Sequence, residues 1–210
     1  HHGPVRWRGV SAHGVPMRAL LDLVYPRSCP GCGRADVAVC AACVGELRPG
    51  VRAAARAVPE VRYCAGYSGW MRDVLIEYKN GAEHRVHALA AVLRSALPPP
   101  AALVVAVPST PGKLAQRGFD TIGELVQAAG ASALPALRVN RAVADQVGLS
   151  GAQRRANLHG ALTATMLVHG TVWVIDDVVT TGATVAEASR ALRAAGADRV
   201  VAVALCAGRG

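Results

Sequence analysis

Aromatic residues are scarce in this sequence of 210 residues: they make up 4% of it, with a single phenylalanine. Hydrophobic residues nevertheless account for 52%, so a core has to be built mainly from alanine, valine and leucine. Long apolar runs are missing too. The longest one near the middle of the chain, Ala101 to Val107, has the length of a buried strand and is far too short to span a bilayer. We therefore expect no insertion into a membrane.

The sequence lacks a recognisable secretory signal, because no sustained apolar stretch follows a basic start. It also lacks two widespread nucleotide-binding motifs, the G-x4-G-K-[ST] P-loop and the G-x-G-x-x-G dinucleotide fingerprint. The first absence predicts a cytoplasmic protein. The second excludes the phosphate loops of P-loop NTPases and of Rossmann enzymes, so a phosphate site in this chain has to use another kind of loop.

Acidic residues and lysine are few beside arginine. The 23 basic residues and 14 acidic ones give a formal net charge of +9, and all of the basic residues except Lys79 and Lys113 are arginine. Arginine suits two-point contacts with phosphate better than lysine does. The surplus favours a phosphate-rich partner, either nucleic acid or a pyrophosphorylated metabolite, although an alanine- and arginine-rich genome would produce it equally well.

Four of the six cysteines lie close together and form two C-x2-C pairs. They are Cys29, Cys32, Cys40 and Cys43. Such pairs let four thiolates converge on one ion in a tetrahedral site. Without a sign of secretion, the spacing favours a structural zinc site over a disulfide framework, and it is also compatible with an iron–sulfur site. The remaining two, Cys64 and Cys206, are expected to be small buried side chains.

The order of apolar segments indicates an α/β fold. Helical periodicity dominates residues 69–97, and strand–loop–helix units follow. We expect strands at 103–107, 137–139, 172–175 and 200–205, helices at 119–129 and 183–195, and a loop at 108–118. Near-continuous apolar strands that alternate with helices argue for a parallel sheet covered on both faces. The predicted regions are a zinc-binding module at 17–50, a helical hood or linker at 51–100 and an α/β domain at 101–210.

The stretch VWVIDDVVTTGAT, residues 172–184, is the most informative part of the sequence. A buried strand is expected to end in Asp176 and Asp177, and a short threonine- and glycine-containing loop then leads into a helix. Ligands of open α/β sheets bind beyond the carboxyl ends of the strands, and a helix N-terminus favours a phosphate. Two carboxylates beside such a loop suit sugar hydroxyls and a hydrated Mg2+. In the alternative interpretation, Thr181 or Thr184 caps the helix and the aspartates are a solvated strand end.

This stretch resembles the 5-phosphoribosyl-1-pyrophosphate signature of type I phosphoribosyltransferases, and the layout of the chain resembles the ComF family, named for a competence factor. In that family, cysteine pairs are followed by a Tyr-Lys-x-Gly element, here 78–81, and by an Arg-Gly-Phe-Asn-Gln loop, here 117–121. Asp120 and Thr121 depart from the family's version of that loop. The later Gln, Arg and Asn positions of the family match Gln146, Arg154 or Arg155, and Asn157.

The resemblance implies a type I phosphoribosyltransferase-like domain at 101–210 and gives roles to individual residues. Asp176 and Asp177 would hold the ribose hydroxyls and Mg2+. The 5-phosphate would lie in a cradle formed by Thr180, Thr181, Gly182, Ala183 and Thr184. Lys113 or Arg117 would face the pyrophosphate, where a positive charge stabilises the leaving group. Residues 140–160, which are basic and without clear periodicity, would form a mobile flap over the site.

Two functions follow from this resemblance. The first is an enzyme that transfers a phosphoribosyl group to an acceptor that no motif identifies. The second is a non-catalytic protein that senses a nucleotide or binds single-stranded DNA or a DNA-processing partner, in keeping with the link of the family to competence and DNA uptake. An aromatic platform for single strands is not evident, since residues 138–160 contain no Phe, Tyr or Trp. The oligomeric state stays open.

Overall fold

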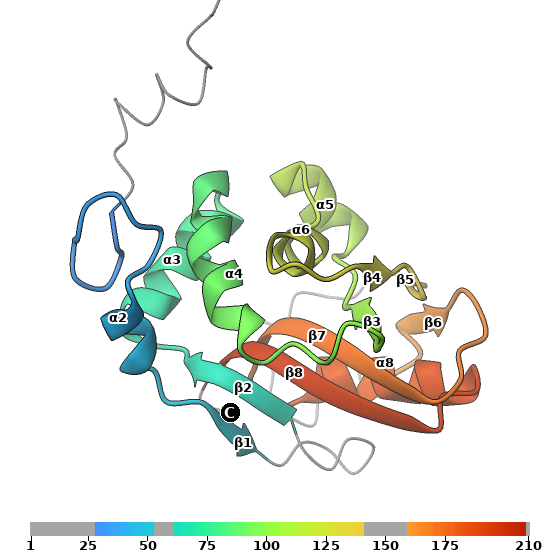
Figure 1. The fold of residues 1–210 in the computed structure, drawn as a ribbon. Helices are drawn as coiled ribbons and strands as arrows, with labels where there is room; N and C mark the ends of the chain where they lie inside the picture. The colour runs from blue at the N-terminus through green and yellow to red at the C-terminus, as the bar shows by residue number, and fades with distance from the viewer. Residues whose placement is uncertain (1–27, 53–60, 141–158, 209–210) are drawn as a thin grey trace, which may run out of the picture.

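A central sheet of six strands organises the molecule (Figure 1). The computed structural model describes residues 28–52, 61–140 and 159–208. The strands of the sheet lie in the order β1 (Gly50–Arg52), β2 (Val61–Gly66), β8 (Arg199–Ala207), β7 (Thr171–Val179), β3 (Leu103–Ala106) and β4 (Ala133–Leu134). All neighbouring strands are parallel except β1, which runs antiparallel to β2 along one edge.

Helices cover both faces of this sheet. One face carries α3 (Gly69–Lys79), α4 (Val86–Arg94) and α6 (Thr121–Ala128), and the other carries α8 (Ala183–Ala194). The shorter helices are α2 (Ala41–Gly45), the 3-10 turn Glu83–Arg85 and α5 (Pro111–Arg117). The predicted α/β fold, with a mostly parallel sheet flanked by helices and an N-terminal four-cysteine module, is confirmed. Within the described ranges, no helix combines the length and the hydrophobicity that a membrane crossing needs.

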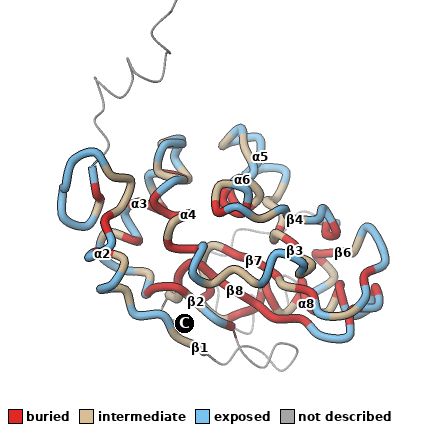
Figure 2. The backbone as a smooth tube through the Cα atoms, viewed as in Figure 1, coloured by how far each residue is buried: buried red, intermediate tan, exposed pale blue. Residues whose placement is uncertain are grey.

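The core is built mainly from small apolar residues, as the composition predicts. Figure 2 shows buried residues along the strands of the central sheet and on the helices beside it. Val74 and Leu75 on α3 join α4, α6 and the strands β7 and β8 in the largest buried cluster. Tyr78 is the only aromatic side chain among the buried core residues of the described ranges. Its hydroxyl donates to the carbonyl oxygen of Thr121 at 3.1 Å, and its ring packs on Phe119 with the ring centroids 5.3 Å apart. Tyr78 therefore serves the packing of α3 against α6.

The segment at 108–118 contains a helix, α5, so the predicted loop was wrong over most of its length. Thr110 caps this helix, because its hydroxyl accepts the N–H of Lys113 at 3.4 Å, and Pro111 occupies the first turn. Gly118 ends it with a left-handed φ of 82°. Proline and glycine thus mark the start and the end of a helix here, and not a loop.

β7 is longer than predicted: the strand expected at 172–175 continues to Val179. The strand continues because β8 stays paired with it, with Asp176 opposite Ala204. Its other neighbour, β3, ends opposite Ile175. On that side, no strand of the described ranges pairs with the residues after Ile175. The two aspartates therefore lie within a strand that is supported on one side and open on the other.

β2 was not predicted, and it lies within the 51–100 range that was interpreted as a helical hood or linker. Its sequence, Val-Arg-Tyr-Cys-Ala-Gly, alternates poorly between apolar and polar residues, and its burial does not alternate either. Parallel pairing with β8 fixes it in the sheet, with Val61 opposite Ala202. The range 51–100 thus contributes a strand to the main sheet as well as the helices α3 and α4.

Both edges of the sheet are short. β1 has three residues and β4 has two. The last residue of β1, Arg52, donates from its guanidinium to the carbonyl oxygen of Gly208 at 2.6 Å and to that of Val179 at 3.5 Å. This side chain ties the edge strand to the C-terminal ends of β8 and β7.

A second, two-stranded sheet lies beside the first. β5 (Leu137–Val139), which was predicted as a strand, pairs antiparallel with β6 (Leu162–Ala164). Beyond the pair, the N–H of Asn140 donates to the carbonyl oxygen of Ala161 at 2.7 Å. Most of the segment expected to form a flap, residues 141–158, lies outside the described residues, so the flap stays a prediction.

α8 holds β6 in place through a buried carboxylate. The side chain of Glu187 is 4% exposed, and its Oε1 accepts the N–H of Leu162 at 3.2 Å. Arg190 donates two hydrogen bonds to the Glu187 carboxylate, at 2.7 and 2.8 Å, and a third to the carbonyl oxygen of Leu162 at 3.0 Å. Burial opposes ionisation of Glu187, but the bonds from Arg190 and from the Leu162 N–H outweigh it and lower its pKa.

Replacing Arg190 with alanine is expected to lower the free energy of unfolding by about 1–3 kcal/mol, because it leaves the Glu187 carboxylate buried without its cation. Urea denaturation measures the change. The matched control is Arg193→Ala on the exposed side of the same helix, which should change stability by no more than about 0.5 kcal/mol. Equal effects of the two substitutions would show that the contact with β6 is of no consequence.

Candidate functional site

The four predicted cysteine ligands converge at one point. The Sγ atoms of Cys29, Cys32, Cys40 and Cys43 all lie within 4.8 Å of one another. The Cys40 Sγ atom is 3.7 Å from the Cys29 Sγ atom and 3.6 Å from the Cys32 Sγ atom. A tetrahedral ion with bonds of about 2.3 Å to sulfur requires sulfur atoms about 3.8 Å apart. The group could therefore hold a structural zinc ion.

Backbone amides prepare this cluster for negative charge. The Sγ atom of Cys40 accepts the N–H of Cys43 at 3.5 Å, and the Sγ atom of Cys29 accepts the N–H of Cys40 at 3.4 Å. Burial acts to raise the pKa of Cys29, but the N–H groups of Cys40, Cys32 and Gly31 outweigh it and hold that pKa at about 6. The hydrogen bond with Cys40 raises the pKa of Cys43 far above its usual range. A bound cation is therefore needed before all four sulfurs are thiolates.

The cysteine module is packed onto the main fold. A Cβ atom at Gly31 would lie 2.6 Å from the Cys43 Sγ atom and 3.2 Å from Trp70 Nε1, so only glycine leaves room between the cluster and α3. Trp70 itself packs against the buried cysteines. The largest core cluster also receives three partly buried side chains of the module, Val39, Val44 and Leu47. Disorder in the module would therefore expose part of the main core.

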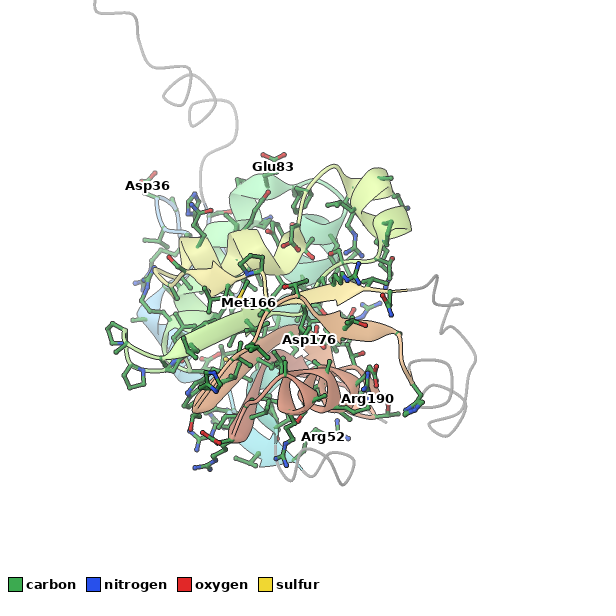
Figure 3. The ribbon with its side chains drawn as sticks, turned by 90° about the vertical axis from the view of Figure 1, so that its right-hand side faces the viewer. Asp36, Arg52, Glu83, Met166, Asp176 and Arg190 are labelled. Atoms are coloured by element: carbon green, nitrogen blue, oxygen red, sulfur yellow. The ribbon has the colours of Figure 1, made fainter. Side chains whose placement is uncertain are left out.

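Asp176 lies in the interior, near the C-terminal end of β7 (Figure 3). Its side chain is buried, with 8% of the residue exposed, and its Oδ1 accepts the N–H of Asp177 at 2.9 Å. Burial, together with the negative charge of Asp177, raises the pKa of Asp176 to about 7, against the opposing effects of the Asp177 N–H, Lys79 and Lys113. Asp176 is thus poised to gain or lose a proton near neutral pH.

One residue at this site was not among the predicted site residues. Lys79, the last residue of α3, forms an ion pair with the carboxylate of Asp177. Both side chains are partly buried, with 22% of Lys79 and 18% of Asp177 exposed. The sequence signal for Lys79 was its position in the Tyr-Lys-x-Gly element at 78–81, which says nothing about a contact with β7.

The loop predicted to cradle a phosphate joins β7 to α8. Gly182 is the N-cap of α8, has a left-handed φ of 73° and makes no side-chain capping bond. Within the described ranges, no hydrogen bond reaches the N–H groups of Ala183, Thr184 and Val185, or the hydroxyls of Thr181 and Thr184. The alternative in which a threonine caps this helix is therefore wrong. A hollow of about 20 Å³ lies here, lined by Asp176 and residues 178–185.

The two basic residues predicted to face a pyrophosphate lie at opposite ends of α5. Lys113 is in its first turn, just beyond the C-terminal end of β3, and its charge lowers the pKa of Asp176. Arg117 is at the far end of the helix, and among the described residues no contact joins it to the aspartates. The structure thus shows an electrostatic effect of Lys113 on Asp176 and no contact of Arg117 with the aspartates among the described residues.

The described site consists of the two aspartates, Lys79, Lys113 and the loop at 180–184. The family-like positions Gln146, Arg154, Arg155 and Asn157 lie outside the described residues. Comparison with known proteins adds no assignment to this geometry: no family model matches the chain, and neither does any curated protein.

Proposed function

We propose that this chain is a ComF-like phosphoribosyltransferase-type protein that binds 5-phosphoribosyl-1-pyrophosphate together with Mg2+. The observation that carries the proposal is the arrangement at the end of β7. The buried carboxylate of Asp176 and the partly buried one of Asp177 lie beside a helix N-terminus whose first amides are unused by the described residues. Carboxylates attract a metal or sugar hydroxyls, and the helix N-terminus attracts a phosphate. A phosphorylated sugar diphosphate with its metal satisfies both requirements at once.

In this proposal each group has one task. The amides at the start of α8 and the hydroxyls of Thr180, Thr181 and Thr184 bind the 5-phosphate, and Gly182 leaves the backbone accessible. Asp176 and Asp177 accept hydrogen bonds from the ribose hydroxyls and from waters of a hydrated Mg2+. Mg2+, when bound, supplies positive charge that the carboxylates and the pyrophosphate share. Lys113 faces the pyrophosphate and stabilises its charge as it departs.

The proposal extends to the rest of the chain. The four-cysteine group holds zinc in a structural role, and the protein works in the cytoplasm, where its thiolates stay reduced. Transfer of the phosphoribosyl group to an acceptor is the leading function. Nucleotide sensing or binding of single-stranded DNA in competence is the second candidate, because the net charge of +9 favours a polyanion.

The test is a melting curve with phosphoribosyl pyrophosphate and Mg2+. Ligand at 100 times its dissociation constant should stabilise the protein by about 2.7 kcal/mol, because it binds only the folded state. The double substitution of Asp176 and Asp177 by asparagine should remove most of this shift, since neutral amides cannot offset the charge of the metal. The matched control is Asp73→Asn, a carboxylate that is 62% exposed on α3, which should keep the full shift.

Two results would count against the proposal. No shift of the wild type at millimolar ligand and Mg2+ would sink it, and an equal shift in the double variant would remove the proposed roles of the aspartates. If the wild type binds the ligand, pyrophosphate release on adding candidate acceptors would favour the enzyme over the second candidate. Salt-sensitive binding of single-stranded DNA without turnover would favour the second candidate.

A further inference from the structure

The ion pair between Lys79 and Asp177 is unusual within this molecule. It joins the end of α3 to β7, whereas every other ion pair of the described ranges joins residues at most eight positions apart. It is also made by lysine in a chain where Lys79 and Lys113 are the only lysines among 23 basic residues. Both lysines interact electrostatically with the neighbouring aspartates: Lys79 pairs with Asp177, and the charges of Lys79 and Lys113 both favour the ionised form of Asp176. Elsewhere in the chain, arginine supplies the positive charge.

The ammonium of Lys79 occupies a position that a metal ion would also favour. Asp176 and Asp177 are consecutive residues of β7, and their carboxylates are buried and partly buried, respectively. Lys79 supplies the positive charge that contacts Asp177 directly. A divalent cation bound to the same carboxylate would be repelled by the ammonium, and more strongly here than in water because the site is partly shielded from solvent. Lys79 and a free cation therefore compete for Asp177.

Lysine is better suited than arginine to an ion pair that has to be released when a metal binds. Its ammonium is a point charge on a flexible stem with three rotatable donors, so it can leave one oxygen and donate to another. An arginine would grip the carboxylate with two parallel hydrogen bonds and a fixed orientation. A pyrophosphorylated ligand brings new acceptor oxygens to which a released ammonium can move.

We propose that Lys79 is an internal counter-ion: it holds the place of the metal on Asp177 in the ligand-free protein and moves to a phosphate oxygen when metal and ligand arrive together. This inference rests on the proposed function, because it concerns the same site. Its consequence is that free divalent cations bind weakly, and the site takes up its metal with the pyrophosphorylated ligand.

The experiment measures Mn2+ binding to the full chain without ligand, by the electron paramagnetic resonance signal of free Mn2+. Lys79→Met should bind Mn2+ at least ten-fold more tightly than the wild type, whereas Lys79→Arg should bind no more tightly. Arg193→Met, on the exposed side of α8, also removes one positive charge and should change the affinity less than three-fold. Adding Asp177→Asn to Lys79→Met should abolish the gain, which ties it to this carboxylate.

Calorimetry with phosphoribosyl pyrophosphate and Mg2+ supplies the second measurement. Lys79→Met should bind this pair at least three-fold more weakly, although it binds Mn2+ alone more tightly. A purely structural role of Lys79 would move both affinities in the same direction, and that result, or an unchanged Mn2+ affinity, would overturn the inference. Lys79→Gln is measured in parallel, so that a folding defect of one variant does not decide the outcome. Tighter Mn2+ binding by the variants without any phosphoribosyl pyrophosphate binding by the wild type would support the counter-ion and overturn the proposed function.

Discussion

Replacing Cys40 with serine is expected to remove the bound metal and to lower the free energy of unfolding by at least about 3 kcal/mol. Metal binding to a four-thiolate site supplies on the order of 10 kcal/mol of folding free energy in small zinc domains. Cys40 is central to the cluster, because its sulfur approaches those of Cys29 and Cys32 and also caps α2 through the N–H of Cys43. A serine hydroxyl is a poor ligand and a shorter one.

The effect should reach beyond the module, since Val39, Val44 and Leu47 pack on the main core. Elemental analysis and urea denaturation measure metal content and stability, and they also decide between zinc and iron. The matched control is Cys64→Ala, a buried cysteine of β2 outside the cluster, which should keep the full metal content. Wild-type protein without bound metal, or a Cys40→Ser variant with an undiminished content, would contradict the assignment.

Substituting Asp176 by asparagine is expected to stabilise the ligand-free protein. The pKa of Asp176 is raised from 3.8 to about 7 in the folded state, so the folded protein holds the proton more tightly than the unfolded chain does. Stability therefore falls as the pH rises from about 4 to about 7, and the loss is complete above that range. Asparagine resembles the protonated form and removes this loss.

The gain from Asp176→Asn should grow by about 2 kcal/mol between pH 5.5 and pH 8 and then level off. Denaturation curves of both proteins measure this gain across the range, over which the cysteine site stays intact. Asp73→Asn, on the exposed side of α3, should track the wild type at every pH. A variant that is less stable than the wild type at pH 8 would mean that the ionised carboxylate makes favourable native contacts, and Asp176 would then be a structural residue.

Local patterns predicted the parts of this fold that short-range chemistry determines. The C-x2-C pairs at 29–43 specify a cluster because four thiolates need little more than two tight turns to meet. The apolar stretch before Asp176 specified a buried strand, and the following glycine and threonines specified the loop before α8. No local sequence pattern predicts the true end of β7, because that end depends on continued pairing with β8 and on the earlier end of β3.

Long-range contacts account for the remaining differences. Lys79 and Asp177 are far apart in the sequence, and only the packing of α3 on the sheet brings them together. β2 has no clear strand pattern and becomes a strand because β8 provides a partner for it. α5 is a different case: Thr110, Pro111 and Gly118 carried its boundaries in the sequence, and reading them as helix signals would have found it.

The short edges of the main sheet affect the tendency of the protein to aggregate at high concentration. An edge strand offers unpaired N–H and C=O groups on which the strand of another molecule can grow. Here β1 offers three residues and β4 offers two. The guanidinium of Arg52 also covers carbonyl groups at the ends of β7 and β8. The sheet therefore gives a neighbouring chain little template for amyloid-like growth, even though its two central strands, β7 and β8, have nine residues each and are rich in valine.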